Sequence, residues 1–302
     1  MAIGRIGTYA IFQSTLKDMG NTQNQLINLQ MQLSSGLKAQ DYAGISSQAE
    51  QFLDIEKKIT QSDTYLKNNK LVDARLQITS SALDRIIEAA TTLKNIISTR
   101  RSGVQGTLNA FAEQLTDQWQ TISAQLNISS EGRYLFSGTA TDVKPVDTTA
   151  LPELTSLGVP DDGYYQGSKE NIVIRAHEEI SFEYNVRADN SAFQKIFAGI
   201  SMGKYGDTNN DDDALARAYD LVEGGLKDVI TLQATVNSNK VAIDDINTQH
   251  QSLKLYWQGL KEEIVNTDLV SVSTQVAINQ GILQASFQAF ARINSLRLSD
   301  FL

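Results

Sequence analysis

Apolar residues in the first hundred positions recur at alternating steps of three and four residues. The first run comprises Leu16, Met19, Leu26, Leu33 and Leu37. The second comprises Phe52, Ile55, Ile59, Leu66, Leu76, Leu83, Ile87, Ala90 and Ile97. Such spacing puts one apolar stripe on one helix face, as in bundles and coiled coils. The sequence predicts a helical first arm whose second helix, over residues 45–100, is about 80 Å long at 1.5 Å per residue.

The same spacing continues later in the chain. A third helix is predicted from about residue 107 to 129, with Leu108, Phe111, Leu115, Trp119, Ile122 and Leu126 on its stripe. A final arm begins near residue 213 and carries Leu232, Val236, Ile243, Ile246, Leu253, Trp257, Leu260 and Ile264. The stripe then shifts by one residue and continues through Leu269, Val272, Val276, Leu283, Phe290 and Ile293. This shift predicts a joint between two helices at residues 264–269.

The centre of the chain has a different pattern. All three prolines, Pro145, Pro152 and Pro160, fall there, and proline is costly inside helices. The stretch "YYQGSKENIVIRAHEEISFEYNV" (residues 164–186) alternates apolar and polar residues in places, which predicts two or more strands joined by a polar turn. We expect a short helix after a capping box at Ser191 and Gln194. "GDTNNDDD" (residues 206–213) is predicted to be a loop whose last aspartates suit the next helix N-terminus.

The predicted fold class is mainly α with a small β-rich insert. Both termini build a long antiparallel helical bundle or coiled coil, and the central β domain projects from it. A pair of amphipathic terminal helices leaves half of each apolar stripe uncovered, so neighbouring copies of the chain are the simplest partners. We therefore predict self-assembly through Leu16, Met19, Leu26, Leu33, Leu37, Val276, Leu283, Phe290 and Ile293.

Composition narrows the functional classes. The chain has 302 residues, a net charge of −9 and no cysteine. The negative charge disfavours nucleic acid as a partner, and the missing thiols exclude disulfides and thiolate sites. No stretch approaches the ~20 apolar residues of a membrane span, and the first twenty residues lack the apolar run of a cleaved signal peptide.

Candidate chemistry is sparse. The two histidines, His177 and His250, are expected to be exposed or packing residues. "GISMGKY" (residues 199–205) has the wrong spacing for a phosphate-binding loop, and a helix end closed by glycine is the preferred interpretation. The aspartate-rich stretch at residues 206–213 lacks the glycine and glutamate positions of a calcium loop. We expect no catalytic, metal or cofactor-binding residues, no small-molecule substrate and no enzymatic activity.

One short stretch carries a specific resemblance. "EGRYLFSGT" (residues 131–139) resembles the Gly-Arg-Tyr-(Ile/Leu)-Phe-(Ala/Ser)-Gly motif of the bacterial flagellar hook–filament junction proteins, the hook-associated protein 3 family of the flagellin superfamily. "QLSSGLK" (residues 32–38) is similar to a signature shared by flagellins and junction proteins. Residues 164–186 resemble the start of that family's outer domain, and "ARINSLRLSDFL" (residues 291–302) its amphipathic tail.

The resemblance implies an organisation and a location. Residues 1–44 with 262–302 would form an inner-tube coiled coil, 45–138 with 191–261 a helical rod, and 139–190 an outer β domain. The location would be extracellular, at the junction of hook and filament, after export through the flagellar type III apparatus without a cleaved signal peptide. The implied partners are copies of the chain itself, the adjacent hook-associated protein, flagellin and a flagellar export chaperone.

The motif also marks a structural corner. It places an aromatic cluster between two glycines that allow tight backbone bends. We predict that the corner anchors the insert on the helices through Gly132, Arg133, Tyr134, Leu135, Phe136 and Gly138.

Three alternatives to the junction role remain open. The chain could be an unusual flagellin, since "LKAQDYAGISS" (residues 37–47) departs from the proline-containing stretch usual after Ser-Ser-Gly. It could be an enzyme or ligand-binding module held in the central domain, which a bound metal or nucleotide would indicate. It could also be a cytosolic coiled-coil scaffold, which would explain the apolar stripes without the match through the insert.

Overall fold

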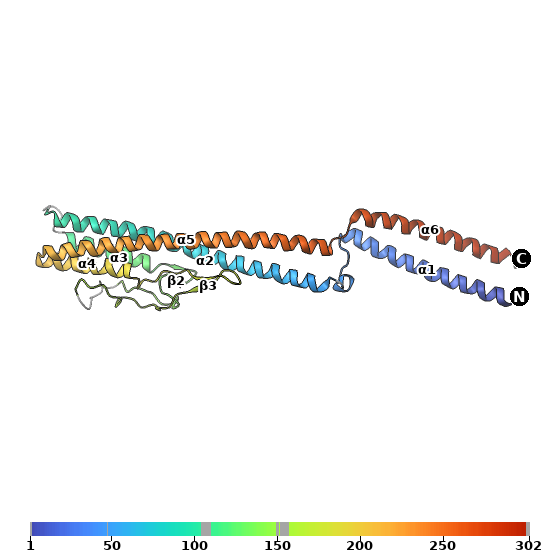
Figure 1. The fold of residues 1–302 in the computed structure, drawn as a ribbon, viewed down its shortest axis with the longest axis horizontal. Coiled ribbons are helices and arrows are strands. Elements are labelled where there is room, and N and C mark those ends of the chain that lie inside the picture. The colour runs from blue at the N-terminus through green and yellow to red at the C-terminus, as the bar shows by residue number, and fades with distance from the viewer. Residues whose placement is uncertain (1, 47, 104–109, 149–150, 152–156, 300–302) are drawn as a thin grey trace. The chain divides into compact units, whose positions relative to one another are not determined.

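The fold, a computed structural model, is mainly helical with small antiparallel strand pairs, as the apolar spacing predicted (Figure 1). The structure describes residues 2–46, 48–103, 110–148, 151 and 157–299. Its helices are α1 (Ala2–Ser35), a 3₁₀ turn η1 (Tyr42–Ile45), α2 (Ala49–Arg101), α3 (Phe111–Leu126), α4 (Ser191–Asn209), α5 (Asp212–Val265) and α6 (Leu269–Ser299). Its strands are β1 (Ser129–Ser130), β2 (Arg133–Tyr134), β3 (Val173–Arg175) and β4 (Ser181–Glu183).

The chain divides into two compact units. One contains Met1–Gln61 and Leu253–Leu302, and the other contains Ser62–Ser252. Both units therefore draw residues from α2 and α5, whose apolar stripes run through the division without a break. The three-part organisation expected from the sequence stays a prediction.

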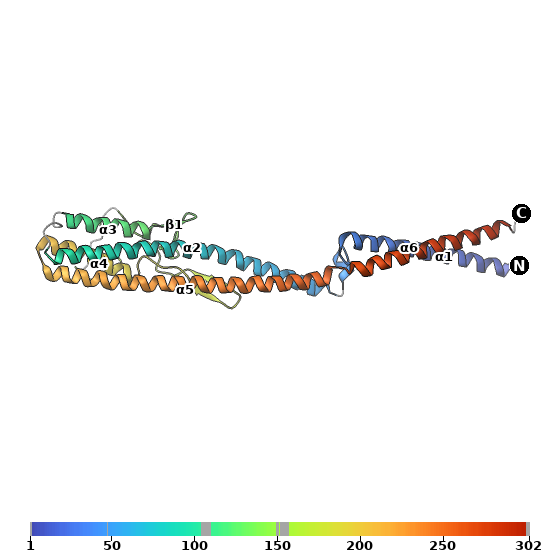
Figure 2. The same ribbon diagram turned by 90° about the horizontal axis from the view of Figure 1, so that it is seen from above.

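In the first unit, α1 and α6 lie side by side in antiparallel orientation (Figure 1 and Figure 2). The rings of Phe12 and Phe290 are 5.1 Å apart between these helices. The predicted joint is confirmed, because α5 ends at Val265 and α6 begins at Leu269. There the backbone N–H of Lys38 donates to the Val265 carbonyl (2.7 Å).

A small apolar cluster lies next to this joint. It consists of Ile45, Phe52, Ile55 and Ile264, with Trp257 and Leu260 packed against them. The Asp41 carboxylate accepts a hydrogen bond from the Gly44 N–H at 3.0 Å and so caps η1. The Lys261 ammonium contacts the Glu56 carboxylate at 2.7 Å and lies 5.2 Å from the centre of the Phe52 ring.

In the second unit, a larger core joins α2, α3, α4, α5 and the insert. The stripe predicted for the third helix is buried in α3 from Phe111 to Leu126, while Leu108 lies outside the described residues. The helix ends at Leu126, three residues earlier than predicted. Trp119 of α3 packs edge-to-face on Phe197 of α4, with ring centroids 4.6 Å apart.

The expected helix end at residues 199–205 is wrong, because α4 continues without interruption to Asn209. The glycines there serve close packing instead. A Cβ on Gly199 would lie 2.5 Å from Val222 Cγ2, and one on Gly225 of α5 would lie 2.7 Å from the Ala192 carbonyl oxygen. Glycine at these positions lets α4 and α5 approach each other closely.

The loop expected at residues 206–213 is also largely wrong. Its first half continues α4, and the connection is reduced to Asn210 and Asp211. Asn210 has the left-handed backbone conformation that ends many helices. The Asp211 carboxylate accepts a hydrogen bond from the Ala214 N–H at 2.9 Å, so an aspartate caps the next helix as predicted.

The cap of α4 lies one residue before the predicted capping box. Asn190, not Ser191, is the N-cap, and its side chain accepts from the Ala192 N–H at 3.0 Å. Gln194 does reach back, but its amide donates to the Asp189 carbonyl at 2.7 Å. Asparagine is as good an N-cap as serine, so the local pattern alone does not choose between them.

The described residues between α3 and α4 contain two β-hairpins, of which the alternating pattern predicted only the second, β3 with β4. In the first, Ser129 pairs with Tyr134 and Ser130 with Arg133. In the second, Ile174 pairs with Phe182 at the centre of β3 and β4.

Candidate functional site: the corner and the terminal helix pair

The corner begins where α3 ends. The side chain of Asn127 accepts from the Val146 N–H at 2.9 Å and donates to the Val146 carbonyl at 2.8 Å. This two-way pairing ties the helix end to the insert. Asparagine after a helix is too common for the sequence alone to have indicated this contact.

The chain then reverses through Glu131 and Gly132, whose φ values are 51° and 75°. Beyond the turn, Phe136 is fully buried and lies edge-to-face with Phe193 of α4, with ring centroids 6.4 Å apart. Leu135 is also buried. Of the predicted anchor residues, Leu135 and Phe136 are thus buried in the core, and the anchoring role of the set stays a prediction.

The two polar members of the motif lie nearer the surface. Tyr134 is half-buried and Arg133 is exposed. The Tyr134 N–H donates to the Thr141 carbonyl at 2.8 Å, which closes the bend that follows the motif. Arg133 and Tyr134 are therefore on a part of the corner that solvent reaches.

The corner is closed by the segment around residues 164–168. The N–H of Ser168 donates to the Ser137 carbonyl at 2.9 Å, and the N–H of Ala188 donates to the Phe136 carbonyl at 2.8 Å. A Cβ on Gly138 would lie 2.1 Å from the Ser168 carbonyl oxygen. The backbone at Gly138 is therefore packed against another stretch of backbone.

Two adjacent tyrosines hold this segment, and neither is among the predicted anchor residues. The Tyr164 hydroxyl donates to the Ala188 carbonyl, and the Tyr165 hydroxyl to the Ser168 carbonyl, each at 2.7 Å. Burial, followed by the charge of Asp189, raises the pKa of Tyr165 to about 12. The same two causes, in the same order, raise the pKa of Tyr164 well above its ordinary value. A tyrosine doublet beside glycines was the available signal.

Both histidines are packing residues, one of the two outcomes expected for them. His250 is 2% exposed, and its Nε2 lies 3.0 Å from the Ala176 carbonyl oxygen. Asn69 donates to the same oxygen at 3.1 Å. The rings of Tyr65, His177 and His250 contact one another, with centroid distances of 5.0 Å (Tyr65–His250), 5.2 Å (His177–His250) and 6.2 Å (Tyr65–His177). This stack fixes the tip of the β3–β4 hairpin on α2 and α5.

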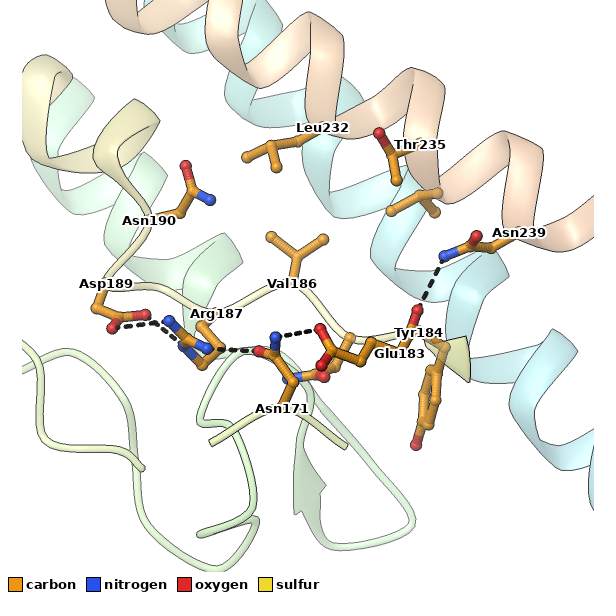
Figure 3. A pocket seen from close by; sticks show the side chains of 12 residues that line it. Asn171, Glu183, Tyr184, Val186, Arg187, Asp189, Asn190, Leu232, Thr235 and Asn239 are labelled. Atoms are coloured by element: carbon orange, nitrogen blue, oxygen red, sulfur yellow. Dashed lines mark hydrogen bonds and ion pairs between the residues drawn. The ribbon is translucent and has the colours of Figure 1, made fainter. Parts of the chain in front are cut away.

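A polar cavity of about 220 Å³ lies between the insert and α5 (Figure 3). Arg187 joins its polar groups, because its guanidinium donates to Asp189 (2.8 Å) and to the side-chain oxygen of Asn171 (2.5 Å). The hydrogen bond to Asp189 raises the pKa of Arg187. Asn171 in turn donates to the Glu183 carboxylate. The Arg187 and Asp189 charges thus pair with each other, and the Glu183 carboxylate is paired with the Asn171 amide.

The terminal pair of α1 and α6 is the second candidate site. Of the predicted assembly residues, Met19 is buried, whereas Leu16 and Leu33 are 41% and 40% exposed. The remaining described ones, Leu26, Leu37, Val276, Leu283 and Phe290, are half-buried. The side chain of Ile293 lies outside the described residues.

Further large apolar side chains on these two helices are exposed. They include Ile27 (47%), Val270 (76%), Ile278 (55%), Ile282 (49%) and Phe287 (54%). Single exposed apolar residues are ordinary, but clusters of this kind commonly mark interaction surfaces. The pair therefore has apolar surface that the two helices do not cover for each other.

Neither a metal-binding cluster nor a membrane-spanning helix is present among the described residues. Within the described residues, no three or more His, Asp or Glu side chains are grouped so as to hold a metal ion. Among the described helices, none is long and apolar enough to cross a membrane.

Comparison with known proteins gives a family match for the N-terminal part of the chain. Residues 6–141 match the family of the bacterial flagellin N-terminal helical region. This match confirms the resemblance of residues 6–141 to the flagellin superfamily. A search of curated proteins found no significant match.

Solved structures define the particular fold. A Vibrio parahaemolyticus protein assigned as flagellar hook-associated superimposes with a TM-score of 0.61 at 16% identity, over 74% of this chain and 100% of the other. FlgL of Bacillus cereus superimposes with a TM-score of 0.55 at 16% identity, over 70% of this chain and 99% of the other. The chain thus has the fold of flagellar hook-associated proteins.

Proposed function

We propose that this chain is a subunit of the junction between the flagellar hook and the filament. The observation that carries the proposal is the apolar surface left exposed on α1 and α6, because such a surface becomes buried only when further helices pack on it. The match to a flagellin region and the hook-associated fold support a flagellar axial assembly as the place where those helices come together.

The proposed partners follow from that role. Copies of the same chain would pack through the α1–α6 pair, and the layers on either side would be an adjacent hook-associated protein and flagellin. Before assembly, a flagellar export chaperone would cover the same apolar surface. Export would proceed through the flagellar type III apparatus without a cleaved signal peptide, and the protein would end outside the cell.

A flagellin is the second candidate, because the flagellin N-terminal match on its own is equally compatible with a filament subunit. The "GRYLFSG" corner, with its buried Leu135 and Phe136, favours the junction role. An enzymatic role finds no support in the paired charges of the polar cavity.

Immunogold electron microscopy of intact flagella separates these candidates. An antibody raised against residues 139–190 is expected to place gold in a single band where hook meets filament. Flagella from a strain that lacks the gene serve as the control and should carry no gold. Gold along the whole filament would replace the junction role with that of a flagellin, and gold confined to the cell interior would reject both.

A further inference from the structure

A small cavity lies at the corner itself, separate from the polar cavity of Figure 3 although both are lined by Tyr184 and Asn185. Its volume is about 60 Å³. Side chains from α2, from the "GRYLFSG" stretch and from the insert enclose it. They are Arg75, Thr79, Arg133, Tyr134, Leu135, Thr141, Ile172, Tyr184 and Asn185.

Two side-chain nitrogens of these lining residues are buried without a hydrogen-bond acceptor. They are Nε of Arg75 and Nδ2 of Asn185. The Asn185 amide oxygen accepts from the Ile172 N–H at 2.7 Å, which fixes the orientation of the amide and makes Nδ2 the unpaired donor. Buried donors without acceptors are rare in folded proteins, and one explanation for them is a bound ion or water.

The charge of Arg75 favours a bound anion over water in this cavity. The Arg75 side chain is only 17% exposed, and the nearest carboxylate, that of Glu131, is 3.6 Å away and 63% exposed. The other partner of this guanidinium is the neutral Tyr184 hydroxyl at 3.3 Å. Water screens an exposed carboxylate strongly, so the charge of Arg75 is only partly balanced. The second cation, Arg133, adds to the positive potential, and no carboxylate lines the cavity.

We propose that this cavity binds a small inorganic anion of the size of chloride. The anion would accept hydrogen bonds from Arg75 Nε and Asn185 Nδ2 and balance the guanidinium charge. The cavity volume corresponds to a few water-sized spheres, since one such sphere occupies about 10–15 Å³. This size excludes nucleotides and sugars. Because Arg75 belongs to α2 and Asn185 follows β4, the bound anion would strengthen the attachment of the insert to the helices.

Crystals of the full chain soaked in sodium bromide give a direct test, because bromide replaces chloride and is identified by its anomalous scattering. We expect a bromide ion within about 3.5 Å of both Arg75 Nε and Asn185 Nδ2. Water alone at this place, or an empty cavity, would overturn the proposal. This measurement uses the unmodified protein and does not depend on the folding of any variant.

Thermal unfolding gives an independent test in solution. In sodium chloride we expect Tm to be about 3 °C higher than in sodium gluconate of equal ionic strength, since gluconate is too large for the cavity. Arg75→Gln should lose this chloride-dependent increment. The control is Arg85→Gln, which alters an exposed arginine of the same helix and should retain it. An equal increment in both variants would show that chloride acts elsewhere and would contradict the proposal.

Discussion

At the scale of single residues, the two motif glycines of the corner serve different purposes. Gly132 has a φ of 75°, yet a Cβ there would meet nothing within 4 Å. Gly138 has a φ of 65°, and a Cβ there would also collide with the carbonyl oxygens of Ser168 and Glu170, at 2.1 and 2.8 Å. The motif predicted backbone bends at both positions. The second requirement was not visible in the sequence, because it depends on residues thirty positions later.

Tyr164 and Tyr165 predict an alkaline limit to the stability of the insert. Their folded pKa values lie above the ordinary value near 10. Below pH 10 both phenols are neutral in either state, and their stabilising contribution is fully present. As the pH rises from 10 towards 12, the unfolded chain loses these protons more readily, so the free energy of unfolding should fall.

Urea unfolding at a series of pH values measures this effect. The urea midpoint is expected to be constant from pH 8 to 9.5 and to decrease above pH 10. Tyr165→Phe should weaken the decrease, whereas Tyr205→Phe, at a half-exposed position on α4, should leave it unchanged. An equally steep decrease in the Tyr165→Phe variant would contradict a role for this phenol.

At the scale of elements, the three-and-four spacing predicted α2, the α3 stripe and the joint between α5 and α6. A separate prediction, that glycine ends a helix within residues 199–205, was wrong. Gly199 and Gly206 instead lie inside that helix, where a Cβ would come within 3.0 Å of Val222 and Leu215 respectively. A sequence pattern indicates which face of a helix is apolar but not how near the neighbouring helix comes. For that reason, the sequence alone does not distinguish a glycine that ends a helix from one that allows close helix packing.

The exposed apolar surface of α6 predicts how the chain associates. Ile278 and Ile282 are one helical turn apart on the same face, and both are about half exposed. Burying one such side chain contributes about 1.5–3 kcal/mol. Ile282→Glu should therefore weaken self-association by about 10- to 100-fold in Kd. Sedimentation of the concentrated protein measures this change.

The matched control introduces the same charge at an exposed polar position of the helix. Gln284→Glu should leave the association unchanged, because Gln284 is exposed and polar in the wild type. Equal weakening by both substitutions would assign the effect to net charge rather than to the apolar surface. No weakening by either would indicate that this face of α6 does not contribute to association.

At the scale of the whole molecule, the out-and-back order of helices, insert and helices was predictable from proline position and apolar spacing. The boundary between the two units was not, because the stripes of α2 and α5 continue across it. The corner was predictable only through its family resemblance, since the burial of Phe136 depends on Phe193 of α4. The cavity beside it was not predictable at all. Arg75 is one of several charged residues on α2, and nothing in its neighbours along the sequence distinguishes it.

The two units differ in how much core each one has. Unit 62–252 has a continuous cluster that contains the fully buried Trp119, Phe136 and Phe193. By contrast, α1 and α6 each have a single buried apolar side chain among their described residues. These side chains are Met19 on α1 and Val272 on α6. Hydrogen exchange reports such differences, because the protection of an amide rises with the free energy of the opening that exposes it.

We therefore expect the amides of α1 and α6 to exchange rapidly in the dilute monomer and the core amides of residues 62–252 to exchange slowly. In assembled protein the amides of α1 and α6 should become protected, because neighbouring helices then cover their apolar surface. Hydrogen exchange followed by mass spectrometry of peptic fragments resolves both regions in one experiment. Strong protection of both ends in the dilute monomer would contradict the proposal, since it would mean that the terminal pair needs no partner.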